Sequence, residues 1–84
     1  MAYLLNFSKH AFKELEKIND PYYSNIKKAI YNLAENPRPQ GYKKLKGTEG
    51  YRIRVGDYRI IYDIFDKELL VEIITLGNRK DIYG

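Results

Sequence analysis

The sequence contains no cysteine and only one histidine. Without cysteine there can be no disulfide and no thiolate zinc site, and a single histidine excludes a two-histidine ribonuclease dyad. We interpret that residue, His10, as a surface residue near the start of a helix. No Walker-type glycine loop and no Ser/His triad are present, so we expect neither a metal nor a cofactor.

Long hydrophobic runs are also missing. The longest apolar stretch, at 69–76, is interrupted by Glu72 and is too short to span a bilayer. The N-terminus has no basic segment followed by an apolar one, so we expect no signal peptide. These features, with the absence of cysteine, favour a soluble cytoplasmic protein. The 84 residues fit a single domain over 1–84, which buries a little over ~60% of its unfolded surface.

The positive charge is concentrated in one segment. The chain has 15 Lys and Arg against 11 Asp and Glu, a net charge of +4. Residues 38–59 contain seven basic and two acidic residues, so this segment alone exceeds the net charge of the whole chain. Nine tyrosines add stacking faces and hydroxyl groups. This composition suits an anionic partner such as nucleic acid.

The N-terminal half predicts a strand followed by two helices. Residues 2–7 are short, apolar and aromatic, which is typical of a strand. Ser8 is a candidate N-cap, and apolar spacing predicts a helix over 9–18. Asp20-Pro21 should begin a second helix with Asp as N-cap and Pro at the first helical position. Pro37 should end it near Glu35, and we expect the two helices to form an antiparallel hairpin.

From residue 42 onward the apolar period changes from 3.6 to 2. Strands are predicted over about 43–47, 51–55, 58–65 and 68–76. Gly56-Asp57 has the form of a two-residue hairpin turn, and Asp66-Lys67 is a second predicted turn. The order β-α-α-β-β-β-β predicts an α+β fold, in which the helix hairpin covers one face of a four-stranded antiparallel meander.

The hairpin register assigns side chains to two faces. A two-residue turn pairs Val55 with Tyr58 and therefore Arg54 with Arg59. The predicted core face is apolar and consists of Tyr51, Ile53, Val55, Tyr58, Ile60, Tyr62 and Ile64, followed by Leu69, Val71, Ile73 and Thr75. The opposite face, which we call the open face, has two notable groups: the arginines Arg52, Arg54 and Arg59, and the apolar residues Ile61, Phe65, Leu70 and Ile74.

The open face predicts two kinds of partner. Like charges directly opposite each other, as at Arg54 and Arg59, destabilise a sheet unless an anion binds between them. Exposed apolar side chains beside them indicate a protein partner. Alternatively, Glu72 and Asp63 neutralise the arginines and the tail 77–84 covers the apolar residues.

Arginine, lysine and tyrosine can bind RNA and can also assist its cleavage. Arginine binds phosphate through two parallel hydrogen bonds, and tyrosine stacks on bases. Arginines can also stabilise the negative charge that develops when the 2′-OH of RNA attacks the adjacent phosphate. A general base is not evident, because Arg stays protonated and Tyr titrates near ~10. The residues themselves leave a binding module and an enzyme equally open.

Three segments resemble the RelE/ParE superfamily of type II toxin–antitoxin toxins, and its RelE branch most. They are NPRPQGYKKLKG at 36–47, YRIRVGDYRIIYDI at 51–64 and GNRKDIY at 77–83. The resemblance implies a ribosome-dependent endoribonuclease that cuts mRNA and leaves a 2′,3′-cyclic phosphate. It also implies inhibition by a RelB-like antitoxin, operator DNA bound only through the toxin–antitoxin complex, and a monomeric free toxin.

The resemblance also assigns roles to individual residues. The family's catalytic positions match Arg52, Arg54, Arg59, Arg79 and Tyr83. From the basic composition we assign ribosome and RNA binding to Lys43, Lys44, Lys46, Arg38 and Lys80. From the open face we assign antitoxin binding to Ile61, Phe65, Leu70 and Ile74. Some relatives have lysine at the positions of Arg52 and Arg54, and many have histidine at the position of Asn78. Lysine or histidine can act as a general base, and this chain has neither at those positions. The general base here is therefore Tyr83, water or another group. Two alternatives are a ParE-like inhibitor of DNA gyrase and an inactive partner that binds only antitoxin or operator.

Overall fold

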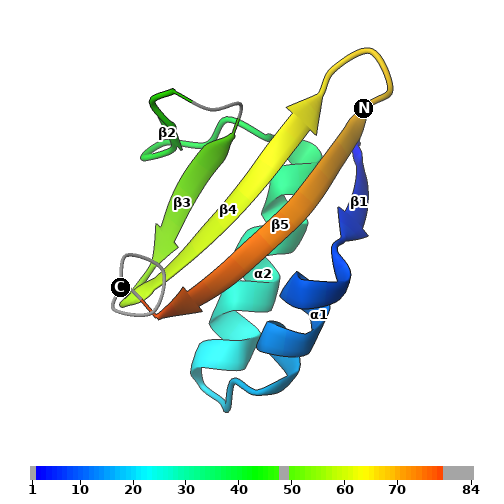
Figure 1. The fold of residues 1–84 in the computed structure, drawn as a ribbon. Coiled ribbons are helices and arrows are strands. Elements are labelled where there is room, and N and C mark those ends of the chain that lie inside the picture. Colours follow the sequence, from blue (N-terminus) through cyan, green and yellow to red (C-terminus); the bar gives the residue numbers. More distant parts are fainter. Residues whose placement is uncertain (1, 48–49, 79–84) are drawn as a thin grey trace.

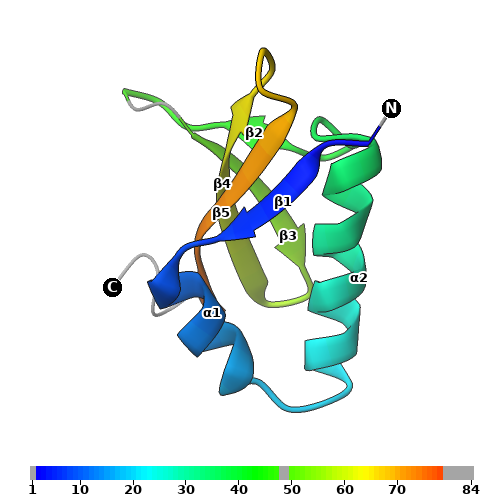
Figure 2. The ribbon, with the colours of Figure 1, turned by 90° about the vertical axis from the view of Figure 1, so that its right-hand side faces the viewer.

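The computed structural model describes residues 2–47 and 50–78. Its strands form one five-stranded sheet in the order β1-β5-β4-β3-β2, and both helices lie on the same face of that sheet (Figure 1, Figure 2). The elements are β1 (Leu4–Phe7), α1 (Lys9–Glu16), α2 (Tyr22–Glu35), β2 (Lys43–Lys44), β3 (Tyr51–Val55), β4 (Tyr58–Phe65) and β5 (Leu70–Asn78). The predicted α+β class and element order are confirmed. Within the described ranges, no helix is long and apolar enough to cross a membrane.

Helix α1 begins where predicted and ends two residues early. The Ser8 hydroxyl accepts a hydrogen bond from the backbone N–H of Ala11 at 3.0 Å, which makes Ser8 the N-cap. The helix ends at Glu16, because the chain then tightens and the N–H of Ile18 bonds to the carbonyl of Leu15 at 3.1 Å.

Helix α2 ends at Glu35 as predicted and begins later than predicted. The N-cap is Pro21 and the first helical residue is Tyr22, whereas the sequence suggested a cap at Asp20. The Asp20 carboxylate still serves this terminus, since it accepts hydrogen bonds from both the N–H and the hydroxyl of Ser24.

The helices run in opposite directions, as predicted, and each packs mainly on the sheet. Helix α1 lies on β5, and α2 crosses β1, β3 and β5 (Figure 2). The core between the layers consists of Ala11, Leu15, Ile26, Ile30, Leu33, Ile53, Ile60, Tyr62, Ile64, Val71, Ile73 and Leu76. The core face predicted for β3 and β4 is therefore confirmed.

The β3–β4 hairpin has the predicted register. Val55 pairs with Tyr58 and Arg54 with Arg59. Gly56 occupies the first turn position with φ +61°, which is the conformation that a type II′ turn requires. Because a Cβ on Gly56 would meet nothing within 4 Å, the glycine is needed here for its backbone angle.

The other strands differ from the sequence prediction. The predicted antiparallel meander of four strands is present as β2 to β5, and β1 extends it to five strands by pairing in parallel with β5. Strand β2 is limited to two residues. The turn between β4 and β5 has four residues, 66–69, instead of the predicted two, because the N–H of Leu69 bonds back to the carbonyl of Asp66 at 3.2 Å. Leu69 was predicted to lie on the core face. It instead belongs to this turn, with φ +50°, and is 36% exposed.

A bulge in β5 corrects the predicted core face near its end. Tyr62 pairs with Ile73, yet Ile61 pairs with Thr75, so Ile74 is an extra residue. The bulge exchanges the two faces of the remaining strand. Leu76 is consequently buried in place of Thr75.

Candidate nucleic-acid interface

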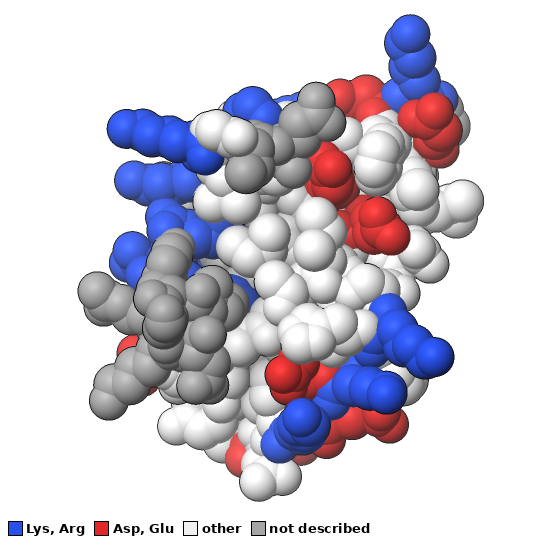
Figure 3. All heavy atoms as spheres, viewed as in Figure 1, with Lys and Arg blue, Asp and Glu red and all other residues white. Residues whose placement is uncertain are grey.

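Two pairs of like charges lie across neighbouring strands. Arg54 on β3 lies opposite Arg59 on β4, and Lys43 on β2 lies opposite Arg52 on β3. The hairpin turn fixes the first pair and the short β2 ladder fixes the second. Directly opposed residues of antiparallel strands have Cβ atoms about 4.5–5.5 Å apart, and like charges at that spacing cost stability. The sheet therefore concentrates positive charge at one edge (Figure 3).

A small cavity lies beside the first of these pairs. Its volume is ≈100 Å³, and it is lined by Arg54, Gly56, Asp57 and Arg59. Two guanidinium groups and one carboxylate line it, so its net charge favours an anion. A space of this size suits a single phosphate group.

The two arginines differ sharply in exposure. Arg54 is exposed, whereas Arg59 is only 4% exposed. Arginine remains protonated in proteins, and a charge removed from water interacts more strongly with a neighbouring charge than an exposed one does. The register placed both residues on the open face but gave no indication that Arg59 is buried.

Arg38, predicted to bind RNA, makes a bidentate ion pair within the protein. Its two terminal nitrogens lie 3.3 and 3.0 Å from the carboxylate oxygens of Asp66, which also accepts the Tyr3 hydroxyl at 2.8 Å. The Asp66 carboxylate raises the pKa of Arg38, and the Arg38 guanidinium, followed by the Tyr3 hydroxyl, lowers the pKa of Asp66. This cluster ties the segment after α2 to the β4–β5 turn.

The lysines of the predicted RNA-binding set lie on and next to β2. Lys43, Lys44 and Lys46 are all exposed. Lys44 also lies 4.8 Å from the ring centroid of Tyr51, which in turn stacks on Tyr62 at 5.8 Å. Basic and aromatic groups are thus interleaved beside the two like-charge pairs.

The predicted apolar group also lies on the open face. Phe65 and Ile74 are each 37% exposed, and Ile61 and Leu70 are half-buried. In Figure 3 uncharged surface extends across this face beside the lysines and arginines.

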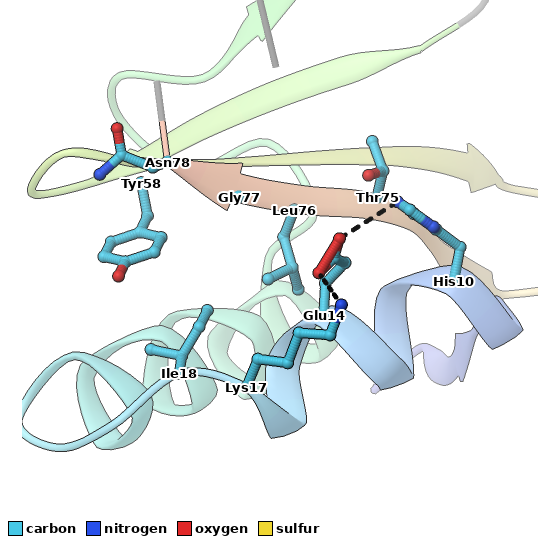
Figure 4. A pocket seen from close by; sticks show the side chains of 9 residues that line it. All are labelled: His10, Glu14, Lys17, Ile18, Tyr58, Thr75, Leu76, Gly77 and Asn78. Carbon is cyan, nitrogen blue, oxygen red and sulfur yellow. Dashed lines mark ion pairs between the residues drawn. The ribbon is translucent and has the colours of Figure 1, made fainter. Parts of the chain in front are cut away.

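A larger cavity was not indicated by the sequence. Its volume is ≈490 Å³, and it lies between α1 and the end of β5 (Figure 4). Glu14 there lies 3.9 Å from His10 and 3.5 Å from Lys17, so the ammonium group of Lys17 offsets the charge of its carboxylate. His10 is exposed, and it lines this cavity at the opposite end from Tyr58 and Asn78 (Figure 4).

The remaining predicted residues, Arg79, Lys80 and Tyr83, lie outside the described residues. Across 2–47 and 50–78, no three His, Cys, Asp or Glu side chains gather to hold a metal ion. The arginines of the like-charge pairs can bind a phosphate and stabilise negative charge on it.

Comparison with known proteins identifies the family of this chain. Residues 5–83 match the family model described as the ParE toxin of the type II toxin–antitoxin system parDE, and the chain belongs to this family.

Within it, the chain is similar to the mRNA interferase toxin RelE of Escherichia coli K12, with 32% identity over 95% of this chain and 86% of that protein. It is also similar to the toxin in the crystal structure of the intact E. coli RelBE toxin–antitoxin complex, with 31% identity and a TM-score of 0.81 over 92% of this chain and 96% of that one. The archaeal RelE–RelB complex from Pyrococcus horikoshii gives 30% identity and a TM-score of 0.83 over 94% and 97% of the two chains.

Proposed function

We propose that this protein is a toxin of a type II toxin–antitoxin system that cleaves mRNA on the ribosome. It acts as one domain spanning 1–84 and works in the cytoplasm, where ribosomes translate mRNA. The reaction is metal-independent: the 2′-OH of the RNA attacks the adjacent phosphate, the bond to the 5′ oxygen of the next nucleotide breaks, and a 2′,3′-cyclic phosphate remains. The similarity to the E. coli mRNA interferase toxin RelE supports this activity.

The observation that carries the proposal is the opposed pair Arg54 and Arg59 beside a phosphate-sized cavity. A bound phosphodiester, which carries one negative charge, offsets part of the repulsion between these two positive charges. Its negative charge increases in the transition state, so the two guanidinium groups bind the transition state more tightly than the substrate. Arg52 supplies a third positive charge on the same face.

The other roles rest on the family resemblance. Arg79 stabilises the leaving group, and Tyr83 stacks on a base or transfers a proton. The exposed lysines Lys43, Lys44 and Lys46 bind rRNA phosphates, which a concentration of exposed positive charge favours. Lys80 and Arg38 complete the proposed RNA-binding set, Arg38 while it is paired with Asp66.

We further propose that a RelB-like antitoxin binds the apolar open-face group Ile61, Phe65, Leu70 and Ile74. The solved relatives named RelBE and RelE–RelB complexes support such a partner. Two of the four side chains are more than one-third exposed, and burying them against a partner removes apolar surface from water. The free toxin is a monomer, and operator DNA is bound only through the complex.

The test is a reconstituted translation reaction with the purified protein, in which the 5′ ends of the mRNA are mapped with and without ribosomes. We expect codon-spaced cuts only when ribosomes are present. Arg54→Ala should lower the cleavage rate about 10²-fold, the scale of removing one transition-state donor. Lys28→Ala, which removes an exposed charge on α2, is the matched control and should cleave normally. Unchanged cleavage by Arg54→Ala would show that the site is wrong.

A second candidate function is inhibition of DNA gyrase, because the matching family model is named after ParE. A supercoiling assay run in parallel separates the two activities. Loss of supercoiling with intact mRNA would replace our proposal with this one. Absence of both effects would indicate an inactive partner of the antitoxin.

A further inference from the structure

A third cavity borders Arg54 at the edge of β3 that faces away from β4. It has a volume of ≈380 Å³ and lies between α2, the segment 39–41 and β3. Its lining consists of Ala29, Asn32, Pro39, Gln40, Gly41, Ile53 and Arg54. None of these residues except Arg54 belongs to the predicted site.

The lining combines an apolar floor with an amide rim. Ile53 is 7% exposed, and Ala29 and Pro39 are half-buried, whereas Asn32 and Gln40 are exposed. Flat apolar walls accept the face of an aromatic ring, and each amide offers one donor and one acceptor at the edge of that ring. This is the chemistry that recognises a nucleobase.

The edge of β3 adds backbone groups to the same cavity. Strand β2 pairs only with Tyr51 and Arg52, so within the described residues no strand covers β3 beyond Arg52. In a two-residue hairpin Val55 and Tyr58 form a hydrogen-bonded pair, and such pairs alternate with non-bonded ones. The N–H and C=O of Arg54 therefore point away from β4, toward the edge where the cavity lies.

Arg54 borders both this cavity and the phosphate-sized one. Its backbone lies at the edge of β3 beside this cavity, whereas its side chain lies on the open face with Arg59. A nucleotide joins its phosphate to its base through one ribose, so the two sites must be neighbours if one nucleotide is to fill both. Gly41 has φ +92°, and a Cβ built on it would meet nothing within 4 Å, which leaves room on that side. The volume is sufficient for a purine.

We propose that the cavity formed by Asn32, Gln40, Ala29 and Ile53 binds the base of the nucleotide whose phosphate lies on Arg54, with adenine preferred. Asparagine and glutamine pair with adenine through its adjacent donor and acceptor atoms. Asn32 and Gln40 are then specificity-determining residues. This inference rests on the proposed RNA cleavage for its biological meaning, whereas the binding it describes can be measured without cleavage.

The binding test uses ¹⁵N-labelled protein and the side-chain NH₂ signals of Asn32 and Gln40. Adenosine 3′,5′-bisphosphate should shift both signals, and ribose 5-phosphate, which lacks a base, should not. Ala29→Leu fills the cavity and should abolish the shifts, whereas Asn25→Ala, an exposed position on the same helix, should leave them intact. The proposal is overturned if the nucleotide leaves both amide signals unmoved. If a purified RelB-like antitoxin shifts the two signals and the nucleotide does not, the cavity binds protein and the proposal is likewise overturned.

The cleavage test varies the base on each side of the cut among A, C, G and U. We expect the intact protein to favour adenine at one of the two positions. Asn32→Ala and Gln40→Ala should each reduce that preference about ten-fold, whereas the control Asn25→Ala should keep both the preference and the cleavage rate. An undiminished preference in both variants would overturn the proposal. If no RNA is cut but the NMR shifts appear, the proposed function fails and the base pocket stands.

Discussion

Replacing Arg54 by glutamine should make the protein more stable and less active. Arg54 lies directly opposite Arg59 in the β3–β4 ladder, and relieving a like-charge pair at this spacing is worth roughly 0.2–1 kcal/mol. For a domain of this size, 1 kcal/mol corresponds to about 4–8 °C in Tm, so we expect a rise of about 1–8 °C at low salt. Glutamine retains most of the side chain, so packing changes little.

The salt dependence of this gain identifies its electrostatic origin. The Debye length falls from about 10 Å at 0.1 M to about 3 Å at 1 M salt, so the gain in Tm should shrink as salt is added. Lys28→Gln removes the same charge from an exposed position on α2 and should change Tm little. Thermal melts followed by circular dichroism measure both.

Phosphate provides an independent check of the same reasoning. A ligand that binds only the folded state raises its stability by an amount that grows with concentration, about 2.7 kcal/mol at 100 Kd. Inorganic phosphate at constant ionic strength should therefore raise the Tm of the unaltered protein more than that of Arg54→Gln. A destabilised Arg54→Gln variant, or equal phosphate effects on both proteins, would refute the view that this pair is arranged for an anion.

Two further predictions concern the scaffold. Tyr62→Phe removes a fully buried hydroxyl that donates to the carbonyl of Pro37 at 2.7 Å, so the free energy of unfolding in urea should fall by about 1–3 kcal/mol; an unchanged urea midpoint would contradict this. Arg38 and Tyr3 lower the pKa of Asp66 in the folded protein. The ionised carboxylate therefore stabilises the fold fully above the ordinary Asp pKa of about 4. This stabilisation is lost as the pH falls through the lowered pKa of the folded state. Asp66→Asn should therefore lose less stability than the unaltered protein between pH 5 and pH 2, and parallel pH curves for the two proteins would show that the ion pair does not contribute.

The sequence by itself determined the β3–β4 hairpin, because local chemistry sets its geometry. Gly56 stands at a turn position that needs positive φ, and apolar and other residues alternate strictly on both sides of it. Together these two features allow only one pairing register for the two strands. That register placed Ile53 and Ile60 in the core and set Arg54 against Arg59. The helix boundaries near Ser8 and Pro37 follow from capping and from proline sterics in the same way.

Tertiary structure decided whatever depends on contacts between distant segments. The parallel pairing of β1 with β5 joins segments more than sixty residues apart, and no local pattern encodes it. The bulge at Ile74 follows from β4 and β5 packing together, and it exchanges Thr75 for Leu76 in the core.

The same reason applies to the candidate sites. Alternation along a strand gives the face on which Arg59 lies, whereas its exposure of 4% depends on what the rest of the chain places around it. The ion pair between Arg38 and Asp66 and the cavity lined by both Asn32 and Arg54 likewise exist only once the helices dock on the sheet. The sequence therefore determined which charges oppose each other, and the fold decided which of them are exposed and which cavities border them.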